Sequence, residues 1–422
     1  GTLWKLNAAK RAVARGVRVA GCDASEGSSV YVSAPFENLG DNANWKFGTG
    51  VATWTGAKDG NFTNDLNWAG GTAPDAETVA EIAAGATVTI SSPVTVGGLF
   101  LGGGTGAVQL KANAELSVNG LLSVGTNATL ELNAPATARA VEVLAGGEIT
   151  HAKYASGVQR TLDLSVTGDM VVDADGKVSA AGKGPGDVNI GSTGASHGGR
   201  GYGGVACYGS YVHPSKAGSH GRDSQSGGIV RLKVGGALVV NGQVDADAKS
   251  TAYYYGSSGG SVWITAKSVS GAGAIRADAG DNGSAQNSRI GTGGRIAVVA
   301  TDTVAADTLL MSAGYARSWC GGASGTVYWK DGTMTHGKLG LLNRRVSATE
   351  EFIFGPGCVT PMTGDWTVDG VEVFGPALLA VGDGRTLTLP NGFASVGSTD
   401  SKARGGLLVT DGAVAAGSGP QT

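Results

Sequence analysis

The sequence is poor in charged residues, aromatic residues and cysteine. Charged residues make up 15% of the 422 residues, aromatic residues 6%, and there are 4 cysteines. So few cysteines exclude a disulfide-stabilised scaffold, and no CxxC spacing indicates a zinc site. The formal net charge of −3 argues against nucleic acid as a partner, because phosphate binding needs a clustered positive surface. No apolar run of about 18 residues is present, so we expect no membrane-spanning segment here.

Glycine, in contrast, is abundant. The 74 glycines do not recur at every third position, which excludes collagen. Hydrophobic residues reach 41% and fall in alternating runs, which argues against disorder. Glycine costs about 1 kcal/mol per helical position relative to alanine, so long helices are disfavoured. These features together predict an all-β chain with many tight turns.

Short alternating segments recur along the chain from residue 86 onward, separated by Gly, Asn or Pro turns. Their repetition at roughly 20 residues predicts a right-handed parallel β-solenoid (β-helix), with long glycine-rich loops on one side. A β-sandwich is the competing fold. We expect four regions: an N-terminal segment or the end of a preceding unit (1–52), a solenoid start with short coils (53–160), a long-loop solenoid (161–332), and C-terminal coils or a small β unit (333–422). The opening stretch, residues 3–16, is compatible with a short basic helix or with a strand.

Three glycine pairs mark the long-loop region: Gly227-Gly228, Gly259-Gly260 and Gly293-Gly294. Their first members are 32 and 34 residues apart (227 to 259, 259 to 293). Each pair precedes a strand, a turn, a second strand and an Ala/Asp/Gly exit. Such pairs fit places where the backbone turns tightly or approaches a neighbouring coil closely.

Chemistry-bearing side chains concentrate in four loops, 184–226, 249–258, 281–292 and 315–323, which a solenoid would stack on one side. They hold His197, Arg200, Tyr202, Tyr208, Tyr211, His213, Lys216, His220, Arg222, Tyr253, Tyr254, Tyr255, Arg289, Tyr315, Arg317 and Trp319. Aromatic faces for sugar rings and cations for acidic groups predict a glycan-binding surface. Cys207 and Cys320 also lie in these loops, either paired or as free thiols.

Two segments resemble known surface proteins. Trp54, Gly60, Phe62, Asn67, Trp68 and Pro74 resemble the repeat that opens β-helical passenger regions of autotransporter-like bacterial surface proteins of the verrucomicrobial type. SHGGRG (196–201), YGS…P…GS (208–219), GGSVWI (259–264) and GGRIAV (293–298) resemble a glycine-rich module of large bacterial surface proteins and some plant glycine-rich proteins. The resemblance implies an extracellular β-rich module and no particular chemistry. We expect the two tryptophans and Phe62 to close the end of the strand stack; a sugar-stacking platform is the alternative.

The alternative to a structural role is a polysaccharide lyase acting on acidic glycans by β-elimination. Such an enzyme needs a base for the C5 proton and a cation beside the uronate carboxylate. His213 or Tyr211 would be the base, and Arg200 or Arg222 the cation. A glycosidase needs two facing carboxylates, and Asp187, Asp223 and Asp281 show no such pairing. The competing interpretation is that these polar side chains hydrogen-bond the glycine-rich backbone.

No cofactor is expected. The stretch VDADGKV, with Asp173 and Asp175, begins like a calcium loop but lacks the glutamate at position twelve, so a polar turn is the better interpretation. The chain begins without Met and shows no signal peptide, which we interpret as a piece of a longer protein. We therefore expect a secreted or surface-attached structural or adhesive module of a surface protein or filament. Its partners would be a polysaccharide or cell-surface glycan, with end-to-end self-assembly through open strand edges.

Overall fold

The computed structural model describes residues 3–8, 12–15, 17–27, 30–33, 37–47, 50–155, 157–186, 195–201, 206–221, 224–249, 256–280, 291–314, 322–343, 359–375, 377–392, 396–398 and 406–417. These residues form short strands in mostly parallel sheets. The one helical element among them is a 3-10 turn, η1 (Asp65–Asn67). The prediction of an all-β chain is confirmed.

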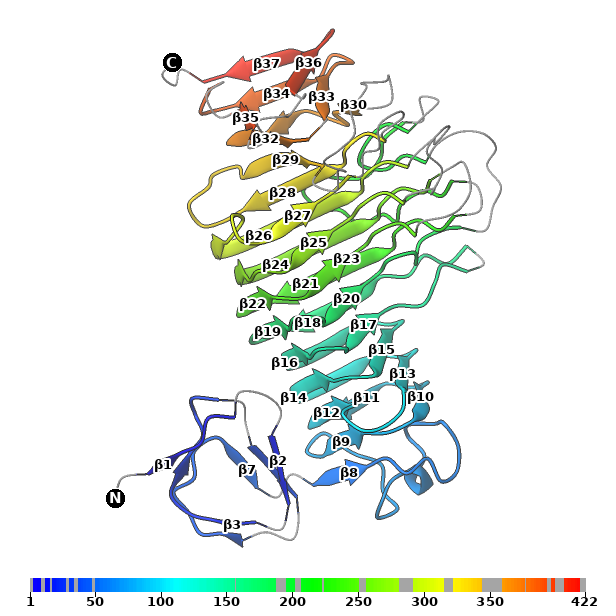
Figure 1. The fold of residues 1–422 in the computed structure, drawn as a ribbon, viewed down its shortest axis with the longest axis vertical. Coiled ribbons are helices and arrows are strands. Elements are labelled where there is room, and N and C mark those ends of the chain that lie inside the picture. The colour runs from blue at the N-terminus through cyan, green and yellow to red at the C-terminus, as the bar shows by residue number, and fades with distance from the viewer. Residues whose placement is uncertain are drawn as a thin grey trace.

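Two large sheets form the central part of the molecule, stacked strand upon strand along its long axis (Figure 1). The 8-stranded sheet contains β10 (Ala86–Ile90), β13 (Val108–Ala112), β15 (Ala128–Leu132), β17 (Glu148–Thr150), β20 (Lys177–Ser179), β23 (Gln243–Asp245), β25 (Ala274–Arg276) and β27 (Leu310–Ser312). The 16-stranded sheet contains β8 (Val51–Thr53), β9 (Val79–Ile82), β11 (Val94–Val96), β12 (Gly98–Leu101), β14 (Leu116–Val124), β16 (Ala136–Val143), β18 (Leu162–Val166), β19 (Met170–Val172), β21 (Ile229–Val234), β22 (Ala237–Val240), β24 (Ser261–Ser270), β26 (Arg295–Val304), β28 (Thr326–Lys330), β29 (Lys338–Leu342), β32 (Gly370–Phe374) and β35 (Val396–Ser398).

Alternation of side chains explains how these strands stack. In β13 the residues Val108, Leu110 and Ala112 are buried and the two between them are not, as expected for a strand with one face on a core. Parallel pairing sets Leu110 beside Val88 on one side and Leu130 on the other. Like side chains thus form columns, and the main core runs unbroken from β8 to β29.

The glycine pairs make close approach possible between neighbouring repeats. A Cβ on Gly260 would lie 1.9 Å from the Gly228 carbonyl oxygen, and one on Gly294 would lie 2.1 Å from that of Gly260. The amide of Gly260 donates to the Ala246 carbonyl at 2.7 Å, and that of Gly294 to the Ala277 carbonyl at 2.8 Å. No side chain fits here, so both the glycine pairs and the alanine exits of the sequence pattern serve this contact.

The four long loops each connect the 8-stranded sheet to the next strand of the 16-stranded sheet. They run from β20 to β21, from β23 to β24, from β25 to β26 and from β27 to β28. In Figure 1 the ends of these connections emerge on one side of the stack. The sequence pattern therefore placed the insertions at one recurring point of the repeat.

The N-terminal residues form three small parallel sheets, drawn in blue beside the stack in Figure 1. The pairs are β1 (Trp4–Lys5) with β4 (Cys22–Asp23), β3 (Arg18–Val19) with β6 (Glu37–Asn38), and β2 (Ala12–Arg15) with β5 (Val30–Ser33) and β7 (Trp45–Phe47). The strand alternative for residues 3–16 is thus correct where the structure describes them, and the helix alternative is wrong. Tyr31 joins this part to the stack, because its ring packs edge-on against Phe100 at 5.5 Å and its hydroxyl accepts from the Leu121 amide.

The first strands of the stack are closed by an aromatic cluster. The Trp68 ring lies 5.0 Å from both the Trp54 and Phe62 rings, and its indole nitrogen donates to the Phe62 carbonyl. Phe62 in turn pairs its amide with the Thr89 carbonyl of β10. Burial of Phe62 and Trp68 favours the end-closing role over an exposed sugar platform.

Strand direction reverses once near the C-terminal end. β28 and β29 pair antiparallel, with Tyr328 beside Leu339, whereas β29 and β32 pair parallel again. Beyond this reversal lies a second core. Its other strands are β30 (Val359–Pro361), β33 (Leu378–Val381) and β36 (Gly406–Val409) in one sheet, and β31 (Trp366–Thr367), β34 (Thr386–Leu389) and β37 (Ala413–Ala416) in another. Over the described residues, no helix has the length and apolarity needed to cross a bilayer.

Candidate functional site

The loop between β20 and β21 runs along the stack and contacts strands far from its own ends. We call its described part, residues 195–201 and 206–221, the strap. The Gly198 amide donates to the Gly293 carbonyl at 3.0 Å, and the Arg200 amide donates to the Val359 carbonyl at 3.2 Å. In the opposite direction, Gln159 Nε2 donates to the Ser215 carbonyl at 3.5 Å. The strap thus ties together segments on both sides of the strand reversal.

Serine hydroxyls hold the two arms of the strap together. Ser219 Oγ accepts from the Ser196 amide at 2.9 Å and donates to the Ser196 carbonyl at 2.6 Å. Ser258 Oγ, below them, accepts from the Ser219 amide at 2.8 Å. These bonds satisfy backbone groups that the glycine-rich sequence leaves without strand partners.

His197 is enclosed in the centre of the strap. It is fully buried, and its Nδ1–H donates to the Gly259 carbonyl at 2.8 Å. The Tyr208 ring stacks on it at 4.7 Å, and the Tyr208 hydroxyl donates to the Ala217 carbonyl at 2.8 Å. Burial, with the nearby Arg295 charge, lowers the pKa of His197 to about 3. The imidazole is therefore neutral at physiological pH.

Arg295, the first residue of β26, is the buried cation beside this pair. Its Nε donates to the Tyr208 carbonyl at 2.8 Å and its Nη1 to Thr326 Oγ1 at 3.0 Å. Burial lowers the pKa of Arg295 to about 10. Among the described residues, Arg295 Nη2 and His197 Nε2 have no hydrogen-bond partner. The guanidinium fastens the strap to β26 and β28, and it does not face solvent.

Tyr211 and His213 lie on different aromatic neighbours. The Tyr211 ring is 4.7 Å from that of Trp366 and 5.5 Å from that of Tyr328, and burial raises its pKa. His213 is exposed, and its ring meets the edge of Trp263 at 5.1 Å.

A groove runs along the outer face of the 16-stranded sheet next to Trp263. Trp263 and Thr265 project from the same face of β24, and Thr265 pairs with Lys233 of β21. The groove has a volume of about 660 Å³ and contains two lysines, Lys233 and Lys267. Its hydroxyl groups come from Ser165, Thr167, Thr265 and Thr301, and no carboxylate lines it. Val166, Val234 and Ala266 supply its apolar surface, so the groove combines apolar surface with hydroxyl groups and two cations.

The remaining predicted site residues have different fates. Arg200 and Lys216 are exposed, and His220 is buried. Cys207 is a free thiol whose pKa burial raises to about 11, and Cys320, its suggested partner, lies outside the described residues. Also outside them are Tyr202, Arg222, Tyr253, Tyr254, Tyr255, Arg289, Tyr315, Arg317 and Trp319, with Asp187, Asp223 and Asp281.

A row of buried acids lies at the exits of β23 and β25. Asp247 forms an ion pair with Arg276 at 3.0 Å, and the Asp278 amide donates to Asp247 Oδ1 at 2.7 Å. Ser312 Oγ donates to Asp278 Oδ1 at 2.7 Å. Burial, reinforced by Asp247, raises the pKa of both Asp245 and Asp278 to about 7. These acids stabilise neighbouring repeats through hydrogen bonds.

The described residues contain no group of three or more His, Cys, Asp or Glu side chains arranged to hold a metal ion. In the suspected calcium loop, Asp175 adopts φ 64° and the Gly176 amide donates to the Asp173 carbonyl at 2.8 Å. This geometry is that of a tight turn between β19 and β20.

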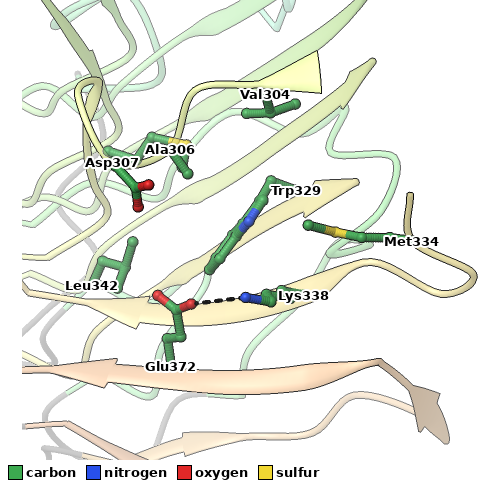
Figure 2. Close-up of a pocket in the computed structure, with 9 residues that line it drawn as sticks. Val304, Ala306, Asp307, Trp329, Met334, Lys338, Leu342 and Glu372 are labelled. Carbon is green, nitrogen blue, oxygen red and sulfur yellow. Dashed lines mark hydrogen bonds and ion pairs between the residues drawn. The ribbon is translucent and has the colours of Figure 1, made fainter. Parts of the chain in front are cut away.

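A pocket of about 410 Å³ opens at the strand reversal (Figure 2). Its apolar walls are Val304, Ala306, Met311, Trp329, Met334 and Leu342. Asp307, Lys338 and Glu372 supply its charged groups, and Lys338 Nζ lies 3.5 Å from Glu372 Oε1.

Sequence reasoning missed Arg295, the Lys233–Lys267 groove and this pocket. Arg295 lies in GGRIAV, where the glycine pair indicates the repeat and nothing indicates that the arginine is buried. The two lysines occupy alternate, outward positions of strands, a pattern that usually indicates only solvent exposure. The pocket needs the reversal between β28 and β29, which no repeat pattern announces. Comparison of the chain with protein-family models, with curated proteins and with solved structures found no match.

Proposed function

We propose that this chain is an extracellular structural or adhesive module, a right-handed parallel β-solenoid of a secreted or surface-attached protein that contacts acidic glycans. The observation that carries the proposal is that the strap packs and hydrogen-bonds within the protein itself. His197, Tyr208 and Tyr211, the side chains best suited to chemistry, are engaged in packing and in hydrogen bonds to backbone. A long loop used in this way adds cohesion to a rod of stacked strands.

The solenoid architecture is supported by the strand order. Successive repeats add one strand to the 8-stranded sheet and one or two to the 16-stranded sheet, in parallel register. A sandwich of antiparallel hairpins would not give this order. End-to-end association of such modules in a filament, through their strand edges, is part of the proposal.

Glycan contact is proposed at the groove beside Trp263. Lys233 and Lys267 attract carboxylate or sulfate groups, the hydroxyls match sugar hydroxyls, and the partly exposed Trp263 offers a ring for stacking. The groove follows the outside of several successive strands, so an extended polymer has room to lie across it. This site differs from the stacked loops predicted from sequence. His213 of the strap is linked to it only in that the His213 ring contacts the Trp263 ring.

The binding test uses a uronate polysaccharide immobilised on a surface and a paired substitution, Lys233→Gln with Lys267→Gln. We expect saturable binding that weakens with added salt and falls at least about tenfold in the double variant. The matched control is Lys111→Gln with Lys177→Gln, on the 8-stranded sheet, which should bind like the unchanged chain. Equal binding by both double variants would remove the groove from the proposal.

The lyase alternative is less well supported. Tyr211 has a raised pKa and lies against Trp366, so it is a poor base at neutral pH. His213 is exposed, and Arg222 lies outside the described residues. Incubation with a panel of uronate polysaccharides, followed by ultraviolet absorbance for unsaturated ends, separates the two functions. A rise in absorbance that His213→Ala abolishes would make the chain a lyase and would overturn the structural proposal.

A further inference from the structure

The pocket at the strand reversal is a concave site in the described part of the chain that the proposed function leaves unused. We infer that it binds a small organic ammonium ion, a compound with one positively charged nitrogen and a compact apolar body. This inference is independent of glycan contact, because the pocket and the groove share no lining residue. Three features carry it: the size of the pocket, its walls and its charge.

Its volume of about 410 Å³ falls in the range of small-molecule sites. The walls come from the end of β26 with the turn after it, β27, β28 with the turn after it, β29 and β32. The antiparallel pairing of β28 with β29 breaks the regular stacking here, so side chains on either side do not fill the space as a continued column would. Trp329 and Leu342 of the main core form its floor, together with Met311.

The charged groups favour a cation. Figure 2 shows the carboxylates of Asp307 and Glu372 directed toward the same space beside the Trp329 ring. Lys338 offsets one of them through its ion pair with Glu372. Asp307 has no hydrogen bond or ion pair to any described residue and is exposed. One negative charge is therefore left over. The Trp329 ring is 3% exposed in the floor of the pocket, so the carboxylates supply most of the attraction for a cation and the ring adds to it at its exposed edge.

Other ligand classes fit this lining less well. An anion would meet two carboxylates and a lysine that is already paired. A neutral sugar needs several donors and acceptors, whereas Lys338 is the one side chain among the lining residues with a charged donor and it is already paired with Glu372. An ammonium compound has a charge that faces Asp307 and Glu372, and its alkyl groups can contact the partly exposed Val304, Ala306 and Met334.

The test compares choline with its uncharged isostere, 3,3-dimethylbutan-1-ol, on the whole chain. Binding is followed by calorimetry and by the proton NMR shift of the N-methyl groups, which a tryptophan ring moves upfield. We expect choline to bind at least about tenfold more tightly than the isostere, and added salt to weaken choline binding alone. Asp307→Asn should weaken choline binding about tenfold and leave the isostere unchanged. Asp302→Asn, an exposed acid of β26 outside the pocket, is the control.

Equal affinity for choline and the isostere would overturn the inference, as would the absence of saturable choline binding. An equal loss in Asp302→Asn and Asp307→Asn would do the same, because it would show a general charge effect. Glu372→Gln provides a second variant if Asp307→Asn alters folding, which circular dichroism and the melting temperature report. Acidic polysaccharide binding should be the same in Asp307→Asn and Glu372→Gln as in the unchanged chain, because neither residue lines the groove. Failure of the choline test therefore leaves the proposed glycan contact standing.

Discussion

Tyr211 of the strap packs its ring on Trp366 of β31, with the two centroids 4.7 Å apart. The two residues belong to opposite sides of the strand reversal, so this contact joins the second core to a loop that begins in the middle of the main stack. Tyr211 also touches Tyr328, one strand before the reversal. The strap therefore reinforces the place where parallel stacking is interrupted between β28 and β29.

Removing the Tyr211 ring should loosen the C-terminal strands selectively. Truncation of a buried aromatic side chain costs about 3–5 kcal/mol, and since Tyr211 is only partly buried we expect Tyr211→Ala to cost about 2 kcal/mol. Hydrogen exchange should show faster opening of β30 to β34 with little change in β10 to β16. Tyr211→Phe keeps the ring and should behave almost like the unchanged chain. Uniform loss of protection along the whole chain would contradict a local role.

Adding one methyl group at a glycine of the three glycine pairs should lower the stability of the fold far more than the size of the group suggests. A Cβ on Gly260 would lie 1.9 Å from the Gly228 carbonyl oxygen, and both are backbone positions that cannot move independently. We expect Gly260→Ala to destabilise the chain by at least about 4 kcal/mol and to reduce soluble yield. Gly85→Ala is the matched control, because nothing lies within 4 Å of the added group. Similar melting temperatures for the two variants would refute the close-contact explanation.

The buried acid Asp278 should make stability fall as pH rises. Its pKa is raised to about 7 in the folded chain from an ordinary value of 3.8, so between these pH values the folded state holds a proton that the unfolded state has lost. The free energy of unfolding contributed by Asp278 is therefore greatest below pH 4 and declines up to about pH 7. We expect the stability advantage of the unchanged chain over Asp278→Asn to shrink between about pH 5 and pH 8. Urea unfolding midpoints at the two pH values measure it; a constant difference would show that Arg276 already compensates the charge.

His197 should act in the opposite direction. Its pKa falls from 6.5 to about 3 on folding, so in that window the unfolded chain takes up a proton that the folded chain refuses. The contribution of the neutral His197 to the free energy of unfolding is therefore complete above pH 6.5. It declines as the pH falls through this window, by up to about 1.4 kcal/mol per pH unit. His197→Gln, neutral at every pH, should lose this acid sensitivity. Parallel unfolding curves for both chains between neutral and acidic pH would count against it.

How far the sequence predicts this molecule depends on the kind of signal. Alternation in segments such as VQLKA fixes both the strand and its buried face, because one residue in two must enter the core. The glycine pairs reveal the spacing of the repeat. Only glycine fits at these positions, because a Cβ there would lie about 2 Å from a carbonyl oxygen of the neighbouring repeat. The sequence shows His197 and Tyr208 as part of a loop rich in polar side chains, but it does not show that His197 is buried. Composition identifies a side chain that can do chemistry and does not show that a neighbouring strand covers it.

The site at the reversal was beyond sequence reasoning for a different reason. Trp329, Asp307 and Glu372 come from separate segments, and each stands in an ordinary strand or turn. Their meeting depends on β29 turning back along β28. A repeat pattern predicts further parallel strands, and it does not indicate the position at which a strand pairs antiparallel instead.

The path of the strap also has a consequence in time. During synthesis or export from the N-terminus, residues 195–221 appear well before Val359 and Trp366, which they later contact through the Arg200 amide and the Tyr211 ring. Strands up to β28 can assemble in order as they emerge, and His197 and Tyr208 of the strap can dock on them. The Arg200 amide and the Tyr211 ring, in contrast, find Val359 and Trp366 only when the C-terminal strands follow. A chain cut short before β30 would therefore leave the Tyr211 ring without its Trp366 contact.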